Sequence, residues 1–342
     1  MNFSKAIILW YQKNKRNLPF RKTKDPYRIW VSEIILQQTR VSQGLPYYER
    51  FVNLFPTVHH LAKAKEDSVM KAWQGLGYYS RARNLHHTAI YISKALKGKF
   101  PDEFEKIKEL KGIGDYTAGA IASIAFNKPH VVVDGNVFRV LSRYFGIITP
   151  VDTIEGKKIF VQKAEELLDK KRPGTFNQAI MEFGALQCVP VNPDCTKCIL
   201  IKDCKAFNKR IVDNLPVKIK KTKIRIRYFN YFVFRAKGKI LIKKRTGSDI
   251  WKNLYDFPLI EMEKPVSLRR IQKLAPGLVK SYSKLIKQVL SHQIIFARFF
   301  EMNTLRKNEN SDFGNTIYIN ENQLNKYAFP RLIEKYFTAK FG

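Results

Sequence analysis

The sequence is poor in acidic residues and lacks long apolar runs. Its 342 residues include 62 Lys and Arg but only 29 Asp and Glu, which gives a formal net charge of +33. A charge this large indicates a polyanionic partner, either nucleic acid or an anionic membrane surface. The membrane alternative is weak, because the longest apolar stretch near the N-terminus, Ala6–Tyr11, is too short for a span or a signal peptide. We therefore expect a cytoplasmic protein with no membrane partner that binds nucleic acid, associated with the nucleoid if its source is bacterial.

Cysteine is scarce and confined to one short stretch. The chain has four cysteines with C-x6-C-x2-C-x5-C spacing: Cys188, Cys195, Cys198 and Cys204. Four thiols this close together suit one metal centre better than a disulfide framework in a cytosolic protein. Zinc is one alternative, since it is often bound by four thiolates. The spacing differs from the paired C-x2-C of a zinc ribbon, so it favours a loop around a larger [4Fe–4S] cluster without excluding zinc.

The basic charge is spread over three segments. Residues 1–204 carry a net +13, residues 205–227 carry nine basic groups against Asp213 alone, and residues 228–342 carry a net +12. The middle segment is short, strongly basic and interrupted by Pro216, as is typical of a connector. We therefore predict a domain over residues 1–204, a basic linker over 205–227 and a second domain over 228–342.

The hydrophobic period differs between the two predicted domains. In the first, apolar residues such as Ile29, Trp30 and Ile34 recur at helical spacing, and Asp25-Pro26 is a typical helix start. In the second, residues 228–234 and 240–242 alternate with a period of two. A further strand is expected near 316–319, and helices near 266–275 and 322–338. The first domain is therefore predicted to be mainly α-helical and the second α+β.

A glycine motif in the first domain is typical of non-specific DNA binding. Residues 110–121, LKGIGDYTAGAI, predict a helix end, a tight turn at Gly112 and Gly114, and a new helix of small residues. Glycines allow a phosphate to approach the backbone, and free N–H groups at a helix start can bind it. The pattern is a helix-hairpin-helix; an ordinary turn between helices is the alternative.

Two carboxylates in the first domain are candidates for acid–base chemistry. Glu33 has Ile29, Trp30 and Leu36 as helical neighbours, so burial is expected to raise its pKa and make it a general acid, although a solvent-facing glutamate is equally compatible. Asp134 precedes the expected helix 137–141, whose dipole would keep it ionised; a simple helix cap is the alternative. Such a pair suits acid-assisted cleavage of a glycosidic bond.

These motifs, in this order, resemble the helix-hairpin-helix DNA glycosylase superfamily. Residues 25–39, DPYRIWVSEIILQQT, closely resemble the MutY-type adenine glycosylases, and residues 75–83 and 177–182 are similar to the same family. The resemblance covers residues 1–215. It implies a monomeric enzyme that excises adenine mispaired with 8-oxoguanine or guanine in double-stranded DNA, and a cysteine loop that binds [4Fe–4S].

The resemblance also implies roles for individual residues. Glu33 would protonate adenine at N7, and Asp134 would stabilise the sugar cation or trap it covalently. The remaining residues fall into three groups: Tyr116 and Asn136 as supports of the carboxylates, Arg21 and Glu182 in the adenine pocket, and Gln38 and Tyr78 as wedges in the base stack.

Position 116 distinguishes this family from its nearest relatives. Endonuclease III-like enzymes, which act on oxidised pyrimidines, carry a Schiff-base lysine where this chain has Tyr116. A tyrosine has no amine, so we predict a monofunctional glycosylase. Two alternatives stay open: an endonuclease III-like glycosylase/lyase, and a non-catalytic iron–sulfur module that binds DNA.

The second domain resembles the MutT-like (Nudix-fold) domain of MutY-type enzymes. It lacks the repeated glutamates of a Nudix hydrolase, so we predict no pyrophosphatase activity. In the family a Phe-Ser-His loop senses 8-oxoguanine, and the resemblance assigns that role to Ser291 and His292, with Leu290 in place of the phenylalanine. A solvent-facing turn is the alternative.

Overall fold

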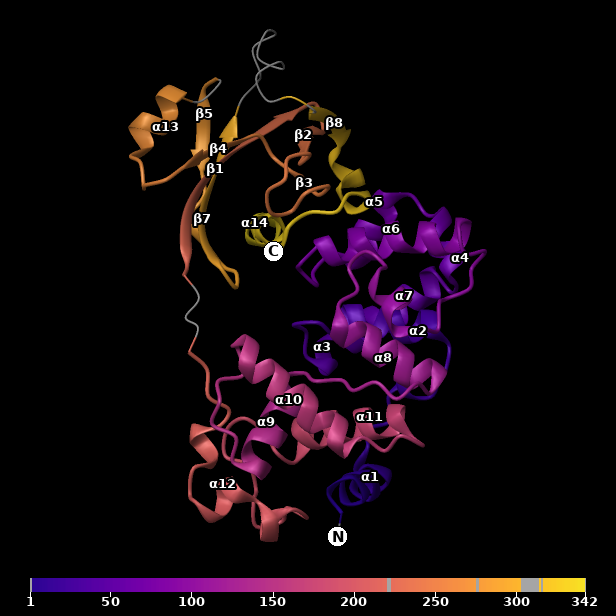
Figure 1. Cartoon of the computed structure of the whole chain (residues 1–342). Helices are drawn as coiled ribbons and strands as arrows, with labels where there is room; N and C mark the ends of the chain where they lie inside the picture. The colour runs from indigo at the N-terminus through magenta and orange to yellow at the C-terminus, as the bar shows by residue number, and fades with distance from the viewer. Residues whose placement is uncertain (1, 220–222, 275–276, 303–313, 315, 342) are drawn as a thin grey trace. The chain divides into compact units, whose positions relative to one another are not determined.

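The structure, a computed structural model, describes residues 2–219, 223–274, 277–302, 314 and 316–341 (Figure 1). The chain divides into two compact units. The first, called here the helical unit, comprises Met1–Ala62 and His87–Lys220. The second, the sheet unit, comprises Lys63–His86 and Lys221–Gly342.

The helical unit is built from the α-helices and short 3₁₀ turns that the spacing of its apolar residues predicts. The helices are α1 (Phe3–Asn14), α2 (Pro26–Leu36), α3 (Val41–Leu54), α4 (Val58–Lys63), α7 (Phe104–Lys108), α8 (Asp115–Phe126), α9 (Gly135–Phe145), α10 (Ile154–Leu167), α11 (Pro173–Leu186) and α12 (Lys205–Asn208), and the turns are η1 (Pro19–Arg21), η2 (Ile201–Asp203) and η3 (Val212–Asn214). As expected, α2 begins at Pro26, and the Asp25 side chain accepts a hydrogen bond from the Tyr27 N–H at 2.9 Å. Among the described residues, no helix is both long and apolar enough to span a membrane.

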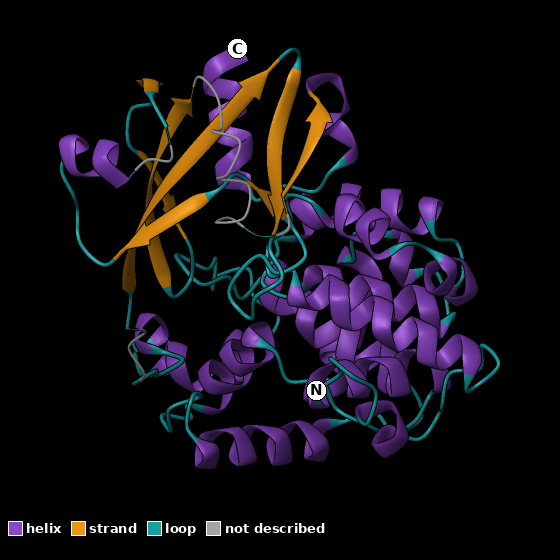
Figure 2. Cartoon of the chain, turned by 90° about the horizontal axis from the view of Figure 1, so that it is seen from above, coloured by secondary structure: helices purple, strands orange, loops and turns teal. Residues whose placement is uncertain are grey.

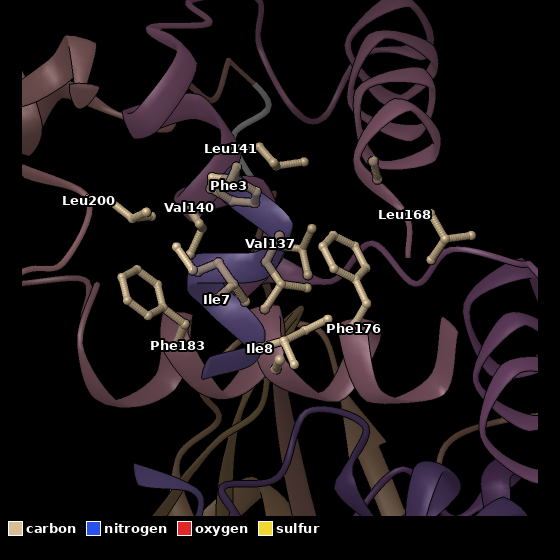
Figure 3. Close-up of a cluster of buried hydrophobic side chains, with 14 of the residues drawn as sticks. Phe3, Ile7, Ile8, Val137, Val140, Leu141, Leu168, Phe176, Phe183 and Leu200 are labelled. Atoms are coloured by element: carbon tan, nitrogen blue, oxygen red, sulfur yellow. The ribbon is translucent and has the colours of Figure 1, made fainter. Parts of the chain in front are cut away.

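One hydrophobic cluster holds together α9 and α11, two of the helices whose residues line the cavity described below. Figure 3 shows α1, α9 and α11 contributing to it, with Ile7, Val137, Phe176 and Phe183 at most 1% exposed. Gly184 of α11 allows the close approach of α9, because a β-carbon there would lie 2.7 Å from Cβ of Asn136. The start of α9 is therefore held tightly against α11.

The sheet unit contains an eight-stranded sheet, coloured orange in Figure 2. Its strands are β1 (Arg225–Ala236), β2 (Lys239–Lys244), β3 (Tyr255–Asp256), β4 (Leu259–Met262), β5 (Val279–Tyr282), β6 (Ile286–Val289), β7 (Gln293–Met302) and β8 (Thr316–Asn320). The central order is β3-β2-β1-β7-β5, while β4 pairs with β1, β6 with β7 and β8 with β2. β1 and β7 are parallel, and the other pairs are antiparallel.

Alternate residues of β1 pack against different helices. Phe229 and Tyr231 share a core with α14 (Arg331–Phe341), whereas Phe232 and Phe234 share one with α13 (Leu268–Leu274). The two helices therefore lie on opposite faces of the sheet. This confirms the predicted α+β class.

The C-terminal helix differs from the sequence expectation. A single helix was expected near 322–338, but the structure has the 3₁₀ segment η5 (Glu321–Lys326) followed by α14. Pro330 accounts for the break, because proline donates no N–H and disfavours helical geometry in the residue before it.

The structure divides the chain differently from the expected domains in two places. Residues 63–86, with α5 (Glu66–Trp73) and the start of α6 (Ser80–Lys94), belong to the sheet unit. There Asp67 forms an ion pair with Lys244 at 2.7 Å. Ordered elements also extend into the stretch expected to be a linker, with α12 and η3 in the helical unit and β1 beginning at Arg225.

Candidate active site

A cavity of about 500 Å³ in the helical unit gathers six of the predicted site residues. They come from η1, α2, α8, the start of α9 and α11: Arg21, Glu33, Tyr116, Asp134, Asn136 and Glu182. The residues lie far apart in the sequence, so the fold alone brings them together.

Glu33 is the carboxyl group of the cavity that can donate a proton near neutral pH. It lies on α2, where Ile29 and Ile34 are buried, and its own side chain is half-buried and lines the cavity. Burial raises the pKa of Glu33 to about 7, although a hydrogen bond from the Tyr116 hydroxyl opposes the shift. Glu33 therefore carries a proton in a substantial fraction of molecules near neutral pH.

Asp134, the second carboxylate of the pair, caps the start of α9. It accepts hydrogen bonds from the N–H groups of Asn136 (2.9 Å) and Val137 (2.8 Å) and from the Asn136 side chain (2.8 Å). Burial raises the pKa of Asp134 from its ordinary value, while these hydrogen bonds lower it. The N–H groups at the helix start therefore lower the pKa of Asp134 against an increase caused by burial, which the sequence did not reveal. The charge of Asp134 in turn helps to raise the pKa of Glu33.

Glu182 is held in the opposite protonation state by two arginines. Arg16 donates to both carboxylate oxygens, at 2.9 and 2.6 Å, and Arg21 contacts the same group at 2.6 Å. Burial would raise the pKa of Glu182, but these contacts override it and lower the pKa to about 2. Arg16, which also lines the cavity, was missed by sequence reasoning, because it stands in a basic N-terminal stretch with nothing to distinguish it.

A second missed residue, Arg139, supports the Asp134 cap. Its guanidinium donates to the Asn136 side-chain oxygen at 2.8 Å and to the carbonyl oxygens of Cys188 (2.7 Å) and Gly184 (2.6 Å). Hydrogen bonds thus run from the backbone of Cys188 through Arg139 and Asn136 to Asp134. The available signal was an arginine within the apolar face of the predicted helix 137–141.

The four cysteines lie in a loop that begins just after α11 and ends at the start of α12. Their sulfurs are close enough for Cys188 and Cys204 to raise the pKa of the Cys195 thiol, after the larger effect of burial. Two donors contact the sulfurs: Arg143 of α9 lies 3.5 Å from Cys188 Sγ, and the Leu200 N–H of the loop lies 3.4 Å from Cys198 Sγ.

The arrangement of these thiols bears on the kind of metal group that they could hold. In the described part of the chain, no three Cys, His, Asp or Glu side chains converge as closely as a single metal ion requires. Four thiols along one short loop are a donor set that a [4Fe–4S] cluster accepts, as does a tetrahedral zinc ion.

The helix-hairpin-helix glycines and Gln38 lie outside the cavity lining. Gly112 has a φ of 85°, which glycine adopts without strain, and forms the turn between α7 and α8. Gly114 precedes α8, and a β-carbon there would meet no atom within 4 Å, so the backbone is open to a ligand. Gln38 follows α2, is exposed and has an unusual φ of 55°.

The structure brings Tyr78 and Ser291 together within the sheet unit. Their hydroxyl groups form a hydrogen bond, and Tyr78 is 45% exposed with a φ of 47°. Ser291 and His292 are exposed in the turn between β6 and β7. Leu290 is half-buried and packs against the core shared with α14, and its aliphatic side chain has no ring to stack on a base.

Comparison with known proteins agrees with this architecture. Residues 31–169 match the HhH-GPD superfamily of base excision DNA repair proteins, and residues 230–339 match the NUDIX domain. The adenine DNA glycosylase of Buchnera aphidicola subsp. Schizaphis graminum is 40% identical over 261 residues, which cover 75% of this chain and 74% of the relative. That of Buchnera aphidicola subsp. Baizongia pistaciae is 34% identical over 339 residues, covering 98% and 96%. The chain belongs to the adenine DNA glycosylase family.

Family membership makes this chain a base-excision repair glycosylase, a hydrolase of N-glycosidic bonds in DNA. The resemblance seen in residues 25–39 is thereby confirmed, as is the expected pairing of a helix-hairpin-helix domain with a Nudix-fold domain. A solved thermostable thymine-DNA glycosylase has a similar fold, with a TM-score of 0.56 and 30% identity over 60% of this chain and 95% of that one.

Proposed function

We propose that this glycosylase excises adenine paired with 8-oxoguanine or guanine in double-stranded DNA. The observation that carries the proposal is the single cavity that holds Glu33, with a pKa near 7, together with Asp134. An adenine turned out of the duplex would enter this cavity, at an unstacking cost of about a few kcal/mol that a mispair reduces. A DNA-binding module without catalysis would have no use for this pair of carboxyl groups.

Glu33 acts as the general acid. Its proton passes to N7 of the bound adenine, which makes the base a better leaving group as the N-glycosidic bond breaks. The neutral Tyr116 hydroxyl donates to the resulting carboxylate and holds it in place. The same carboxylate can then accept a proton from the attacking water.

Asp134 acts on the sugar. Its ionised form stabilises the positive charge that develops at the anomeric carbon, or traps that carbon covalently until water releases it. Asn136 and the N–H groups at the start of α9 orient the carboxylate. Glu182, Arg16 and Arg21 form a charged wall that contacts the edge of the adenine.

Tyr116 makes the enzyme monofunctional. The side chain has no amine to form a Schiff base with the sugar, and burial raises its pKa, so the phenol stays protonated. Base release from an adenine:8-oxoguanine duplex should therefore precede strand cleavage, which appears only after alkali treatment. Nicking equal to base release without alkali would indicate an endonuclease III-like lyase instead.

Cys188, Cys195, Cys198 and Cys204 would hold a [4Fe–4S] cluster. When bound, the cluster closes the 188–204 loop as a structural cross-link. Through Arg139, that loop supports the Asn136–Asp134 pair, while its lysines face the DNA backbone. The turn at Gly112 and Gly114 binds a phosphate, and Gln38 and Tyr78 fill the space left in the base stack.

Ser291 and His292 read the base opposite adenine. Both are hydrogen-bonding groups on an exposed turn, and Tyr78 bonds to Ser291, so the expected wedge and the expected sensor form one surface. Since Leu290 packs inward, recognition of 8-oxoguanine would depend on hydrogen bonding and not on stacking by this residue.

The test is single-turnover base release by the Glu33→Gln variant on adenine:8-oxoguanine, adenine:guanine, adenine:thymine and guanine:thymine duplexes. Loss of a general acid predicts a rate lower by about 10²–10⁴-fold, with duplex binding retained. The exposed Glu49 of α3 provides the matched control, Glu49→Gln, which should keep the full rate. A fully active Glu33→Gln enzyme would refute the mechanism, and release of thymine in place of adenine would refute the substrate.

A further inference from the structure

Among the described residues of the sheet unit, helix α13 packs against only part of one face of the sheet. The register places Tyr228 of β1 beside Phe296 of β7, and Phe296 beside Lys287 of β6. Two residues further along β7 the same face holds Arg298, whose guanidinium lies over the ring of Tyr282 of β5, and Tyr282 is the cross-strand partner of Phe300. We call these five residues the open face. α13 covers this face only further along, where its core includes the rings of Phe232 and Phe300 (Figure 1).

The open face is accessible and rich in aromatic rings. Tyr282 is 50% exposed, while Tyr228 and Phe296 are half-buried and lie parallel, with ring centroids 5.5 Å apart. Apolar residues at its border are also exposed, with Ile226 at 49% and Val289 at 60%. A surface that served only the core would not leave this much apolar area in contact with water.

Cations lie between the rings. The Lys287 ammonium is 5.9 Å from the centroid of Phe296, and the Arg298 guanidinium is 5.8 Å from that of Tyr282. Nε of Arg298 is buried and has no hydrogen-bond partner among the described residues. The neighbouring acidic groups Glu261 and Glu301 belong to the opposite face, since their cross-strand partners are Phe229 and Val233. The positive charge of the open face is thus available to an anionic ligand.

We propose that the open face binds single-stranded DNA. Exposed rings on a sheet stack with unpaired bases, and interspersed cations contact the phosphates that follow the same path. The charge favours this partner over an apolar protein surface. The open face adjoins the turn at residues 290–292, because that turn joins β6 to β7, and both strands contribute residues to the face. The site is separate from the cavity that holds Glu33 and would bind a strand that contains no mispair.

The test uses the full-length enzyme and a labelled oligothymidine of about 12 nucleotides, a length suited to such platforms. Anisotropy is measured with saturating unlabelled, undamaged duplex present, so that duplex-binding surfaces are occupied. The oligonucleotide should stay bound, and Phe296→Leu, which removes the ring and keeps the residue apolar, should weaken its binding about tenfold. Lys287→Ala combined with Arg298→Ala should lower the slope of log K against log salt by about 1.4.

Matched controls separate this proposal from misfolding and from the proposed function. Lys239→Ala, at the exposed first residue of β2, removes one cation outside the open face and should leave the binding unchanged. Each variant should retain adenine release, which shows that it is folded. If the duplex displaces all of the oligonucleotide, or if the face variants bind it as the parent enzyme does, the proposal is wrong. A change in self-association with unchanged oligonucleotide binding would likewise overturn it and assign the face to a protein contact.

Discussion

The active-site cavity and the sheet unit both place carboxylates beside arginines, but the carboxylates differ in burial and in the number of their cationic partners. In the sheet unit Arg227 contacts Asp249 (2.7 Å) and Glu261 (2.6 Å), and Arg245 contacts Asp256 (2.6 Å). In the cavity Glu33 has a neutral phenol, Tyr116, as its hydrogen-bond partner, and its pKa rises to about 7. Contacts with two guanidinium groups, Arg227 and Arg245, hold the pKa of Asp249 below its ordinary value. Burial outweighs the single contact of Asp256 with Arg245 and raises the pKa of Asp256 to about 6, so the balance between burial and cationic partners decides whether a carboxylate stays charged.

The contrast also holds within the cavity. Glu182, with two arginines, has a pKa of about 2, and Glu33, across the same cavity, one of about 7. We therefore expect the same type of side chain to serve as a fixed anion at Glu182 and as an acid at Glu33. The following predictions, from the largest expected effect to the smallest, test whether this difference in partners decides the roles.

The largest effect should follow from Asp134→Asn. The substitution removes the charge proposed to stabilise the sugar cation, so adenine release should fall by about 10³-fold or more. The amide oxygen can still accept the two N–H groups at the start of α9, but the hydrogen bond from the Asn136 side chain is lost, so stability should fall by only about 1–3 kcal/mol. Single-turnover kinetics and thermal unfolding check the two halves of the prediction. Asp152→Asn, in the loop before α10, is the matched control; an Asp134→Asn enzyme of normal rate would remove the catalytic role.

Breaking an ion pair of the sheet unit should act on stability and not on chemistry. Asp256→Ala leaves the largely buried Arg245 without one of its carboxylates and should destabilise the unit by about 3–5 kcal/mol. Urea unfolding measures the loss. The rate of adenine release per folded molecule should stay within about twofold of the parent enzyme. A large rate defect in fully folded protein would show that the ion-pair cluster takes part in catalysis.

Glu33→Gln should increase stability at alkaline pH. A buried carboxyl with a pKa raised from 4.5 to about 7 binds its proton more tightly in the folded state, so the free energy of unfolding falls as pH rises through this window and levels off above it. Glutamine removes this dependence. The difference in free energy of unfolding between the variant and the parent should therefore shift in favour of the variant by up to about 3 kcal/mol between pH 4.5 and pH 8. Parallel pH dependences of the free energy of unfolding for the two proteins would show that the pKa of Glu33 is not raised.

The smallest effect should be on the choice of the opposite base. Replacing both Ser291 and His292 by Ala removes hydrogen bonds at about 1 kcal/mol each, so the preference for adenine:8-oxoguanine over adenine:guanine should fall about tenfold or more. The rate on adenine:guanine should change little. Ser248→Ala, an exposed serine of the same unit, is the control. Unchanged discrimination in the double variant would remove the sensing role from the turn.

Local sequence signals predicted the fold well. Helical spacing and the Asp25-Pro26 start indicated the helical unit, and the period of two over 228–234 indicated the sheet. What local patterns could not show is which distant segments pack together. The assignment of residues 63–86 to the sheet unit depends on contacts such as Asp67 with Lys244, 177 residues apart in the sequence.

The candidate site shows the same limit. Glu33 and Asp134 could be identified because each stands in a distinctive local pattern, and their gathering in one cavity followed from family resemblance and not from spacing. Arg16 and Arg139 were missed because their roles exist only through partners on other helices, at Glu182 and at Asn136 and Cys188. Burial, which moves the pKa of Asp134 upward against its helix cap, is likewise a property of the folded chain.

The most direct test of the central claim is the pH dependence of single-turnover adenine release from an adenine:8-oxoguanine duplex. The proposal makes protonated Glu33 the acid, and its pKa is about 7, so the rate should fall tenfold per pH unit above neutrality. It should also fall at acidic pH, where Asp134 becomes protonated. The Glu49→Gln control should show the same profile. A rate that stays constant or rises between pH 7 and 9 would contradict the assignment of Glu33 as the acid.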